Sequence, residues 1–587
     1  MGIPLSGEVA RLSSSTHPRK RWNIHPPLPP EARAELAPFP ALLAQILYHR
    51  GVRTRAEAVA FLERRWEGPS PFSLKGMGEA VDRIRWAIRR HEPIVVYGDF
   101  DVDGVTSTVI LTQVLQALGA NVRPYIPHRV DEGYDLNREA LARLQEHGVR
   151  LLVSVDCGIR SVEEVAFARK RGLDVIVTDH HWPGTALPPA VAVVNPKQPG
   201  CPYPFKDLSG VGVAYKVAEA LLRVERQVPV RRGTEEPPSP EEFLDLVALG
   251  TVADIVPLTG ENRALSSRGV ALLNEANRPG IRALVERAGL RPGQITTACI
   301  GYILAPRLNA AGRIATATLG YELLATPHRE IAQDLADQLE ALNRERQEMT
   351  RDVFDRARRH LEAAGAAERH LLLVAGEDFH PGIVGLVASL LVEEYYRPSI
   401  VVEKGPEFSK GSARSIPEFH ITQALDQCAD LLVRHGGHAA AAGFTCASAC
   451  LPALEERLED IAREALGDQA LEPSLEIDAV IPLSEVTWQV ADLLALLEPF
   501  GEGNPVPYFL SRDVVVREAR PVGKDGQHLR LLLSDGRAVW DAIAFHYKDW
   551  GDEVPARADV VYSLEPGEWN GEKRLQLNVQ DLRPARP

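Results

Sequence analysis

Short apolar segments alternate with helical patterns between residue 93 and about residue 260. The apolar segments read PIVVYGD, NVRPYIP, RLLVSVDCG, LDVIVTDHH and AVAVVNP, and helical stretches such as TSTVILTQVLQALGA and NREALARLQEHG lie between them. Strands that alternate with helices in this way form a parallel sheet with helices on its faces. The sequence therefore predicts an α/β domain built around such a sheet.

Acidic side chains and histidines stand at the ends of these predicted strands. Open α/β sheets bind ligands at the carboxyl ends of their strands, so we expect these side chains to meet in one crevice. A single acid would be explained as a helix cap or a turn residue, but several in one domain favour a binuclear metal site. The candidates are Asp99, Asp101, Asp103, Asp156, Asp179, His180, His181 and Asp254, the last of which follows a predicted helix.

The mixture of carboxylates and imidazoles narrows the choice of metal. Magnesium prefers oxygen ligands, whereas imidazole suits softer divalent cations, so we expect Mn²⁺ to be preferred, with Mg²⁺ possible and zinc or cobalt as substitutes. Two cations about 3.5–4 Å apart can clamp the attacking and leaving oxygens of a phosphoryl displacement. The pattern thus predicts two divalent metal ions and a phosphoryl-transfer reaction.

The remainder of the chain divides by composition and pattern. We expect a Pro- and Ser-rich flexible arm, a helical segment, the α/β domain, a long helical connector, a second α/β domain and a small β-barrel of short strands. The corresponding ranges are 1–40, 41–92, 93–325, 326–365, 366–470 and 471–587. The fold class is therefore a multidomain α/β protein, because 587 residues exceed the size of one hydrophobic core.

Composition bounds the function classes. No stretch approaches about 18 uninterrupted apolar residues, so we expect no membrane span. Six cysteines without paired spacing indicate reduced thiols and a cytoplasmic protein. The net charge of −14 opposes a uniformly basic surface, but it leaves room for a local basic groove beside an acidic cluster.

The motifs together resemble one family. GDFDVDGVTS, SVDCG, TDHH and GTVADIVPL are similar, in order and spacing, to the motifs of the DHH phosphoesterase superfamily, and within it to the RecJ exonucleases. APRLNAAGR, FHPGIVGLVASLL, GSARS, GGHAAAAGF and PFGEGNPVP extend the resemblance from about residue 41 to residue 587, although Phe379 stands where tryptophan is common. The resemblance implies a DHH catalytic domain, a connecting helix, a DHHA1 domain and a C-terminal OB-fold.

The resemblance also implies a role for each matching residue. Asp156 is expected to bridge both cations, Asp101 and Asp156 to carry the chemistry, and His181 to face the scissile phosphate as a donor or acid. Asp179 would orient a histidine through its second ring nitrogen. The expected metal ligands are Asp99, Asp101, Asp103, Asp156, His180 and Asp254.

A nuclease must also hold phosphates. Taken alone, APRLNAAGR could be a surface helix with solvated arginines and GGHAAAAGF a tight turn, but the resemblance favours phosphate contacts. Arginine forks suit a terminal phosphate, so Arg414, with Ser412 beside it, and Arg307 are the candidates for recognising a 5′ end. The full set of predicted DNA or phosphate contacts is Arg129, Arg307, Asn309, Arg313, Ser412, Arg414 and His438.

The function that these observations favour is a single-stranded-DNA-specific 5′→3′ exonuclease of DNA repair and recombination. The expected partners are single-stranded DNA with a 5′ end, a single-strand-binding protein and a RecQ-like helicase. One alternative is a DHH-type phosphodiesterase for short oligonucleotides or cyclic dinucleotides, which the expected OB-fold opposes. Another is a non-cleaving scaffold, which the intact DFDVD, DHH and TVAD motifs oppose.

Overall fold

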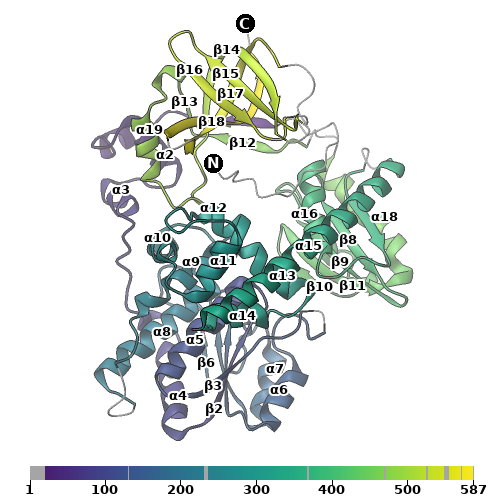
Figure 1. Ribbon diagram of the computed structural model, residues 1–587. Coiled ribbons are helices and arrows are strands. Elements are labelled where there is room, and N and C mark those ends of the chain that lie inside the picture. Colours follow the sequence, from purple (N-terminus) through teal and green to yellow (C-terminus); the bar gives the residue numbers. More distant parts are fainter. Residues whose placement is uncertain are drawn as a thin grey trace.

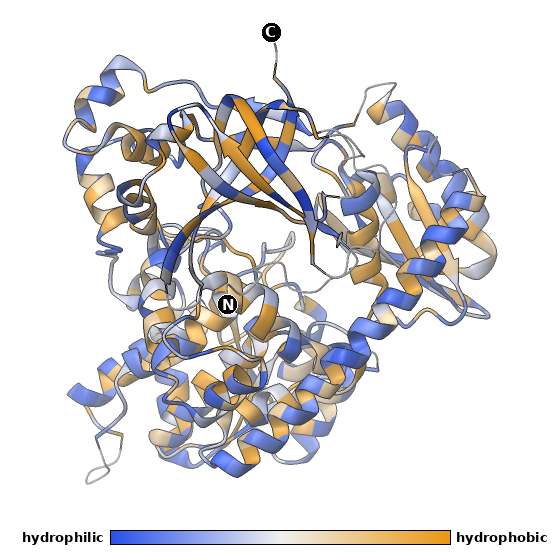
Figure 2. Cartoon of the chain, turned by 45° about the horizontal axis from the view of Figure 1, so that its top comes forward, coloured by the Kyte–Doolittle hydropathy of each residue, from blue (hydrophilic) through white to orange (hydrophobic). Residues whose placement is uncertain are grey.

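The computed structural model describes residues 20–129, 131–230, 236–365, 369–467, 471–523, 526–547, 554–569 and 572–585. Figure 1 shows a first α/β lobe, a second lobe beside it and a C-terminal barrel above both, with one long helix running from the first lobe to the second. In Figure 2 the strands are largely hydrophobic, whereas the helices carry hydrophilic outer faces. Each lobe therefore surrounds its own apolar core.

The first lobe is built on a five-stranded parallel sheet in the order β3-β2-β4-β5-β6. Because alternate residues of a strand point to opposite faces, Ile94 and Val96 pack with α4, α5 and α8, whereas Val95 and Tyr97 pack with α6 and α7. The elements are α4 (Met77–Arg90), β2 (Pro93–Gly98), α5 (Val102–Ala117), β3 (Asn121–Tyr125), α6 (Arg138–Glu146), β4 (Leu151–Val155), α7 (Val162–Lys170), β5 (Asp174–Thr178), β6 (Ala192–Val194) and α8 (Gly210–Gln227). The predicted parallel sheet with covering helices is confirmed.

A helical layer completes this lobe and leads to the connector. Its elements are η2 (Pro240–Phe243), α9 (Leu244–Ala253), α10 (Gly260–Glu275), α11 (Pro279–Arg287), α12 (Thr297–Cys299), the π-helix η3 (Ile300–Leu304), α13 (Ala305–Ile314) and α14 (Thr318–Ala325). The connector is α15 (Arg329–Ala363), a single helix of 35 residues that packs on the first lobe at one end and on α16 at the other. The predicted long connecting helix is confirmed.

The second lobe holds a five-stranded mixed sheet in the order β10-β11-β9-β8-β7. Helix α16 and the end of α15 cover one face, and α17 and α18 cover the other. The elements are β7 (Leu372–Gly376), α16 (Val384–Tyr395), β8 (Ser399–Lys404), β9 (Phe408–Arg414), α17 (Ile421–Asp426), η5 (Ala429–Leu431), β10 (Leu432–Gly437), β11 (Ala441–Ala447), η6 (Ser448–Cys450) and α18 (Leu451–Leu466).

The C-terminal strands close into a barrel. Strand β14 pairs with β15 on one edge and with β17 on the other, and the chain of pairs β15–β16–β18–β17 completes the ring. The elements are β12 (Ser474–Ile477), β13 (Ala479–Val480), η7 (Leu483–Glu485), α19 (Trp488–Ala495), β14 (Phe509–Val522), β15 (His528–Ser534), β16 (Val539–Ala544), β17 (Arg557–Trp569) and β18 (Glu572–Pro584). The predicted small β-barrel is confirmed.

The first described residues belong to the barrel lobe. Strand β1 (Arg21–Ile24) pairs with β12, and α1 (Pro30–Glu35), α2 (Ala41–His49) and α3 (Arg55–Leu62) share the barrel's apolar core. The expectation of a flexible arm over 1–40 therefore does not hold for residues 20–40, because Leu28, Ala32 and Leu36 are buried there. Residues 1–19 lie outside the described part of the chain. After η1 (Pro71–Ser73) the chain enters the first lobe.

No helix within the described residues combines the length and the apolar character that crossing a membrane needs.

Candidate metal centre

Three neighbouring strands place their following residues side by side. The strand registers align Gly98 with Val155 and Val155 with Thr178. The next residues, Asp99, Asp156 and Asp179, are thus the first beyond the sheet at its carboxyl edge. The sheet register explains why acids far apart in sequence meet here, as the pattern predicted.

The loop after β2 supplies two further acids. Asp101 is the N-cap of α5 and accepts a hydrogen bond from the Gly104 amide at 3.0 Å. Asp103, in the first turn, is fully buried and accepts hydrogen bonds from the amides of Gly210 and Val211 at 2.6 and 2.7 Å. The N-terminus of α8 therefore fixes the Asp103 carboxylate.

Asp156 occupies a strained position at the end of β4. Its φ of 62° lies in the left-handed region, which is energetically unfavourable for residues other than glycine. Such strained residues cluster at functional sites. The α8 backbone passes so close that a methyl group on Gly210 would lie 2.4 Å from Asp156 Oδ1. The absence of a side chain at Gly210 therefore leaves space for the Asp156 carboxylate.

His180 lies among three carboxylates. Its Nε2 is 3.2 Å from Asp156 Oδ1, 3.5 Å from Asp254 Oδ2 and 3.9 Å from Asp103 Oδ2. Three groups of ligand atoms lie close enough to hold a cation: Asp99, Asp101 and Asp156; Asp103, His180 and Asp254; and Asp156, His180 and His181. Every predicted metal ligand belongs to at least one group.

Burial makes this arrangement unstable without a counter-charge. Burial first, and then repulsion between neighbouring carboxylates, raises the pKa of Asp99, Asp156 and Asp254 well above the usual range and that of Asp103 to about 7. Within the described chain, Asp99 Oδ1, Asp156 Oδ1, Asp254 Oδ2 and His180 Nε2 are buried without a hydrogen-bond partner. Carboxylate oxygens and an imidazole nitrogen without hydrogen-bond partners are suitable ligands for divalent cations.

Asp179 contacts the histidine beside it instead of joining the metal groups. Its Oδ1 lies 2.7 Å from His181 Nδ1, and its Oδ2 accepts a hydrogen bond from the Ile159 amide at 2.9 Å. Although burial opposes ionisation, the contact with His181 and the histidine charges lower the pKa of Asp179 to about 2. Burial lowers the pKa of His181, but Asp179 more than offsets this and raises it. A charged Asp179 thus orients His181.

Four arginines from separate parts of the chain gather beside this centre. Burial first, and then the charges of Arg129, Arg346 and Arg414, lower the pKa of Arg313 to about 9. Arg129 stacks 4.6 Å from the Phe100 ring and interacts with Asp99 and Asp101. Mutual repulsion of this kind is what a bound anion relieves.

The second lobe contributes the N-terminus of α16 to the same region. Arg414 donates to Ser412 Oγ at 3.3 Å, and a methyl group on Gly385 would lie 3.0 Å from Ser412 Oγ and 3.3 Å from Arg414 Nη2. The N-terminus of α16 is the positive end of that helix's dipole, which favours anions. Arg313, Ser412 and Arg414, which come from separate motifs, therefore lie near one another.

Two predicted phosphate contacts have protein partners. Arg307 pairs with Glu340 of α15 at 2.7 Å and donates to the Ile303 carbonyl at 2.7 Å. Asn309 Oδ1 accepts a hydrogen bond from the Val102 amide at 3.2 Å, which places α13 against the metal loop. The small residues of APRLNAAGR serve this packing, because a methyl group on Gly312 would lie 2.5 Å from the Phe100 carbonyl oxygen.

His438 is exposed in the turn between β10 and β11, and it faces the first lobe. Burial first, and then the charges of Arg160, His181 and Lys197, lower the pKa of His438. Sequence reasoning missed Arg160, Lys197 and Arg346 as neighbours of the centre. Arg346 is half-buried on α15, and no local sequence signal distinguishes it from a solvated arginine.

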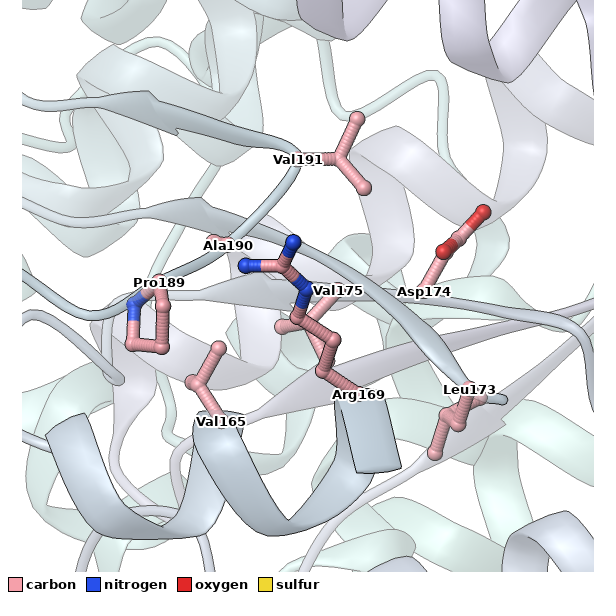
Figure 3. A pocket seen from close by; sticks show the side chains of 8 residues that line it. All are labelled: Val165, Arg169, Leu173, Asp174, Val175, Pro189, Ala190 and Val191. Atoms are coloured by element: carbon pink, nitrogen blue, oxygen red, sulfur yellow. The ribbon is translucent and has the colours of Figure 1, made fainter. Parts of the chain in front are cut away.

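One pocket lies away from this centre. Figure 3 shows Arg169 and Asp174 lining it together with Val165 and Val191. Asp174 begins β5, whereas the metal centre lies beyond the other end of that strand. The pocket therefore belongs to the amino edge of the sheet and takes no part in the site.

Comparison with known proteins identifies the family. The chain matches the DHH family N-terminal domain over residues 93–251, the DHHA1 domain over 369–465 and the RecJ OB domain over 477–581. It is 39% identical over 572 residues to the single-stranded-DNA-specific exonuclease RecJ of Bacillus subtilis, covering 96% of this chain and 71% of that protein. This chain belongs to the RecJ family.

Further relatives and solved structures agree with this assignment. RecJ of Salmonella typhimurium is 36% identical, with 94% of this chain and 97% of that protein covered. The crystal structure of Thermus thermophilus RecJ in complex with Mn²⁺ superposes with a TM-score of 0.81 at 33% identity, covering 97% of this chain and 80% of that one. A Mg²⁺ complex of the same protein gives 0.76 at 31% identity, with 97% and 79% covered. The predicted DHH, DHHA1 and OB domains are confirmed.

Proposed function

We propose that this chain is a metal-dependent exonuclease that degrades single-stranded DNA from the 5′ end with two divalent cations. Membership of the RecJ family supports single-strand-specific exonuclease activity. The observation that carries the proposal is the set of three ligand groups, in which the group of Asp156, His180 and His181 overlaps each of the other two through Asp156 or His180. Mn²⁺ is the preferred cation and Mg²⁺ an alternative, in line with the two Thermus complexes.

The proposed ligands divide into two groups around Asp156. Asp99, Asp101 and Asp156 would hold one cation. Asp103, His180 and Asp254 would hold the other, with Asp156 Oδ1 only 3.2 Å from His180 and so able to bridge. When bound, two such cations supply Lewis-acid activation of water and of the phosphodiester.

His181 is proposed to act on the leaving oxygen. Its Nδ1 is held by Asp179 at 2.7 Å, so that Nε2 is the nitrogen left for the substrate. A charged Asp179 favours the protonated ring, which can donate a proton to the 3′ oxygen as the phosphodiester breaks. Asp101 and Asp156 complete the proposed catalytic set, because each lies in a ligand group and Asp156 joins two of them.

The cluster of Arg129, Arg313 and Arg414 is proposed to recognise the 5′ terminus. A terminal phosphate carries more negative charge than an internal one, and guanidinium forks bind it through paired hydrogen bonds. Arg313 is buried and repelled by the neighbouring arginines, so a bound anion such as a phosphate would stabilise its charge. Ser412 and the N-terminus of α16 would complete this pocket, whereas His438 would contact the scissile region. Arg307 is less suited, because Glu340 already pairs with it.

The C-terminal lobe would bind the DNA beyond the metal centre, because OB barrels bind single strands through a basic groove and base stacking. We propose action in repair and recombination, beside a single-strand-binding protein and a RecQ-like helicase that supplies the strand. A reducing, cytoplasmic location is supported by the six free cysteines, all of which lie within the described residues.

Digestion of end-labelled single strands tests the proposal. With Mn²⁺, a strand labelled on its 5′ nucleotide should release labelled mononucleotide at once, whereas a 3′-labelled strand should shorten gradually. Chelation of the metal should stop both reactions, and a blunt duplex should resist. Cleavage restricted to dinucleotides would favour the short-oligonucleotide phosphodiesterase, and binding without cleavage would favour a scaffold.

A further inference from the structure

A tryptophan with an uncovered ring follows the two histidines of the centre. Trp182 is 61% exposed and stands directly after His181, beyond the end of β5. Aromatic rings contribute to stability mainly by being buried, so packing does not explain a ring in this position. Its place beside the proposed catalytic histidine suggests a contact with substrate.

The backbone under this ring is rigid. Arg160 Nε donates to the Trp182 carbonyl at 2.9 Å. The buried Asn195 donates from Nδ2 to the His181 carbonyl at 2.9 Å and accepts at Oδ1 from the Lys197 amide at 2.7 Å. One side chain thus ties together the loops that carry Trp182 and Lys197. A platform fixed in advance loses little conformational entropy when a ligand binds.

Lys197 places a cation next to the ring. Its Nζ lies 5.7 Å from the Trp182 ring centroid. Burial lowers the pKa of Lys197, and the charges of Asp207, Asp254 and Asp179 oppose this. The ammonium group therefore interacts both with the exposed ring and with carboxylates of the centre. A flat aromatic face next to a cation matches the base and the phosphate of one nucleotide.

The pair lies on a different flank of the centre from the proposed end pocket. In the sheet order β2-β4-β5-β6, Asp99 follows β2, whereas Trp182 follows β5 and Lys197 follows β6. Consistent with this order, Arg129 interacts with Asp99 and Lys197 with Asp254. A strand whose 5′ phosphate lies by Arg129 must cross the metal centre before it reaches Lys197. The nucleotide on this second flank is then the one on the 3′ side of the cleaved bond.

We propose that Trp182 stacks on the nucleobase immediately 3′ of the scissile phosphate and that Lys197 contacts a phosphate of the same nucleotide. This inference rests on the proposed exonuclease function and adds a base-binding position to it. Stacking on a π-face tolerates any base, so the contact holds the strand in register without selecting a sequence.

Steady-state kinetics give the first test. Trp182→Ala should raise KM for a single strand about tenfold and leave kcat within about twofold, because a contact made equally in the ground and transition states changes KM alone. Trp182→Phe should recover most of the loss. The matched control is Trp86→Ala: Trp86 is 44% exposed on α4 and flanked by Arg83 and Arg90, yet it lies on the helix that ends where β2 begins, at the opposite edge of the sheet.

Fluorescence of 2-aminopurine gives the second test. The base is placed at the first, second or sixth nucleotide of a 5′-phosphorylated strand, and binding is followed with Asp156→Ala protein so that the strand stays intact. Quenching should be strongest at the second position and should fall at least fivefold when Trp182→Ala is added, while Trp86→Ala leaves it unchanged. Undiminished quenching at the second position, or an unchanged KM, would overturn the inference while cleavage by the wild-type protein upholds the exonuclease. Absence of cleavage in the wild type would instead refute the function on which it rests.

Discussion

Replacement of Arg263 tests how the barrel lobe is joined to the first lobe. This α10 side chain is 2% exposed, and its guanidinium donates to the carbonyls of Leu497 and Glu498 at 2.8 Å and of Phe61 at 3.1 Å. It also lies 3.8 Å from the Phe61 ring. A single arginine therefore links the helix after Asp254 with the segment that leads into the barrel.

The magnitude follows from these contacts. The guanidinium also donates to the carbonyls of Leu496 and Pro499 at 3.3 Å, and the three shortest hydrogen bonds alone contribute roughly 5–9 kcal/mol. Burial, together with the charge of Arg64, lowers the pKa of Arg263 to about 9, which offsets about 5 kcal/mol of that gain. Arg263→Met keeps most of the volume but leaves buried carbonyls without a donor. We expect the free energy of opening this interface to fall by about 3 kcal/mol.

Hydrogen exchange measures this interface without requiring the whole chain to unfold in one step. The Leu258 amide donates to the Glu502 carbonyl at 2.7 Å, so its exchange reports the opening. Loss of about 3 kcal/mol should speed that exchange roughly a hundredfold. The control is Arg268→Met on the same helix, where the side chain is exposed and lies 3.7 Å from Glu241. Equal exchange rates in the two variants would refute the account of Arg263 as the link.

Three further predictions concern the centre and the DNA. Asp156→Ala should reduce cleavage in Mn²⁺ below a few per cent while circular dichroism and single-strand binding stay near wild type; retained activity would exclude Asp156 as the bridging ligand. Arg414→Ala should slow digestion of 5′-phosphorylated strands at least tenfold more than that of 5′-hydroxyl strands; equal losses in paired initial rates would move it out of the end pocket. Lys573 and Arg574 are exposed on β18 of the barrel. Lys573→Gln with Arg574→Gln should lower the magnitude of the slope of log affinity against log salt by up to about 2, because each lost phosphate contact releases one fewer counterion; an unchanged slope would exclude these two residues from the DNA path.

Most of the fold and of the metal cluster could be predicted because the signals are local. Apolar strands and helical periods alternate within short windows, and a parallel sheet brings its strand ends to one edge whatever the length of the connections. Asp99, Asp156 and His180 were found for this reason. Side-chain contacts then separate Asp99 and Asp156, which belong to the ligand groups, from Asp179, which contacts His181 as expected.

The remaining features depend on contacts between distant parts of the chain. Trp22 donates to Asp581 at 2.6 Å, so the proline-rich start belongs to a domain more than 500 residues away, which composition does not reveal. Arg307 is a predicted phosphate contact, and its pairing with Glu340, two helices later on α15, could not be seen in the sequence. Arg263 carries no sequence signal at all, because only the fold brings backbone carbonyls around it.

The two sides of the metal centre are connected to different lobes. The Asp99–Asp101 loop is held by α13 of the first lobe, through Asn309 and the Val102 amide, and Arg313 of the same helix donates to the Gly382 carbonyl of the second lobe at 3.4 Å. The Asp254 side is held by the barrel lobe, through Leu258 and Glu502. A single-stranded DNA that contacts both the second lobe and the barrel can therefore influence the positions of the ligands on both sides of the metal centre. Removal of the barrel should for this reason reduce kcat as well as affinity, since the loop after Asp254 loses its support along with the DNA.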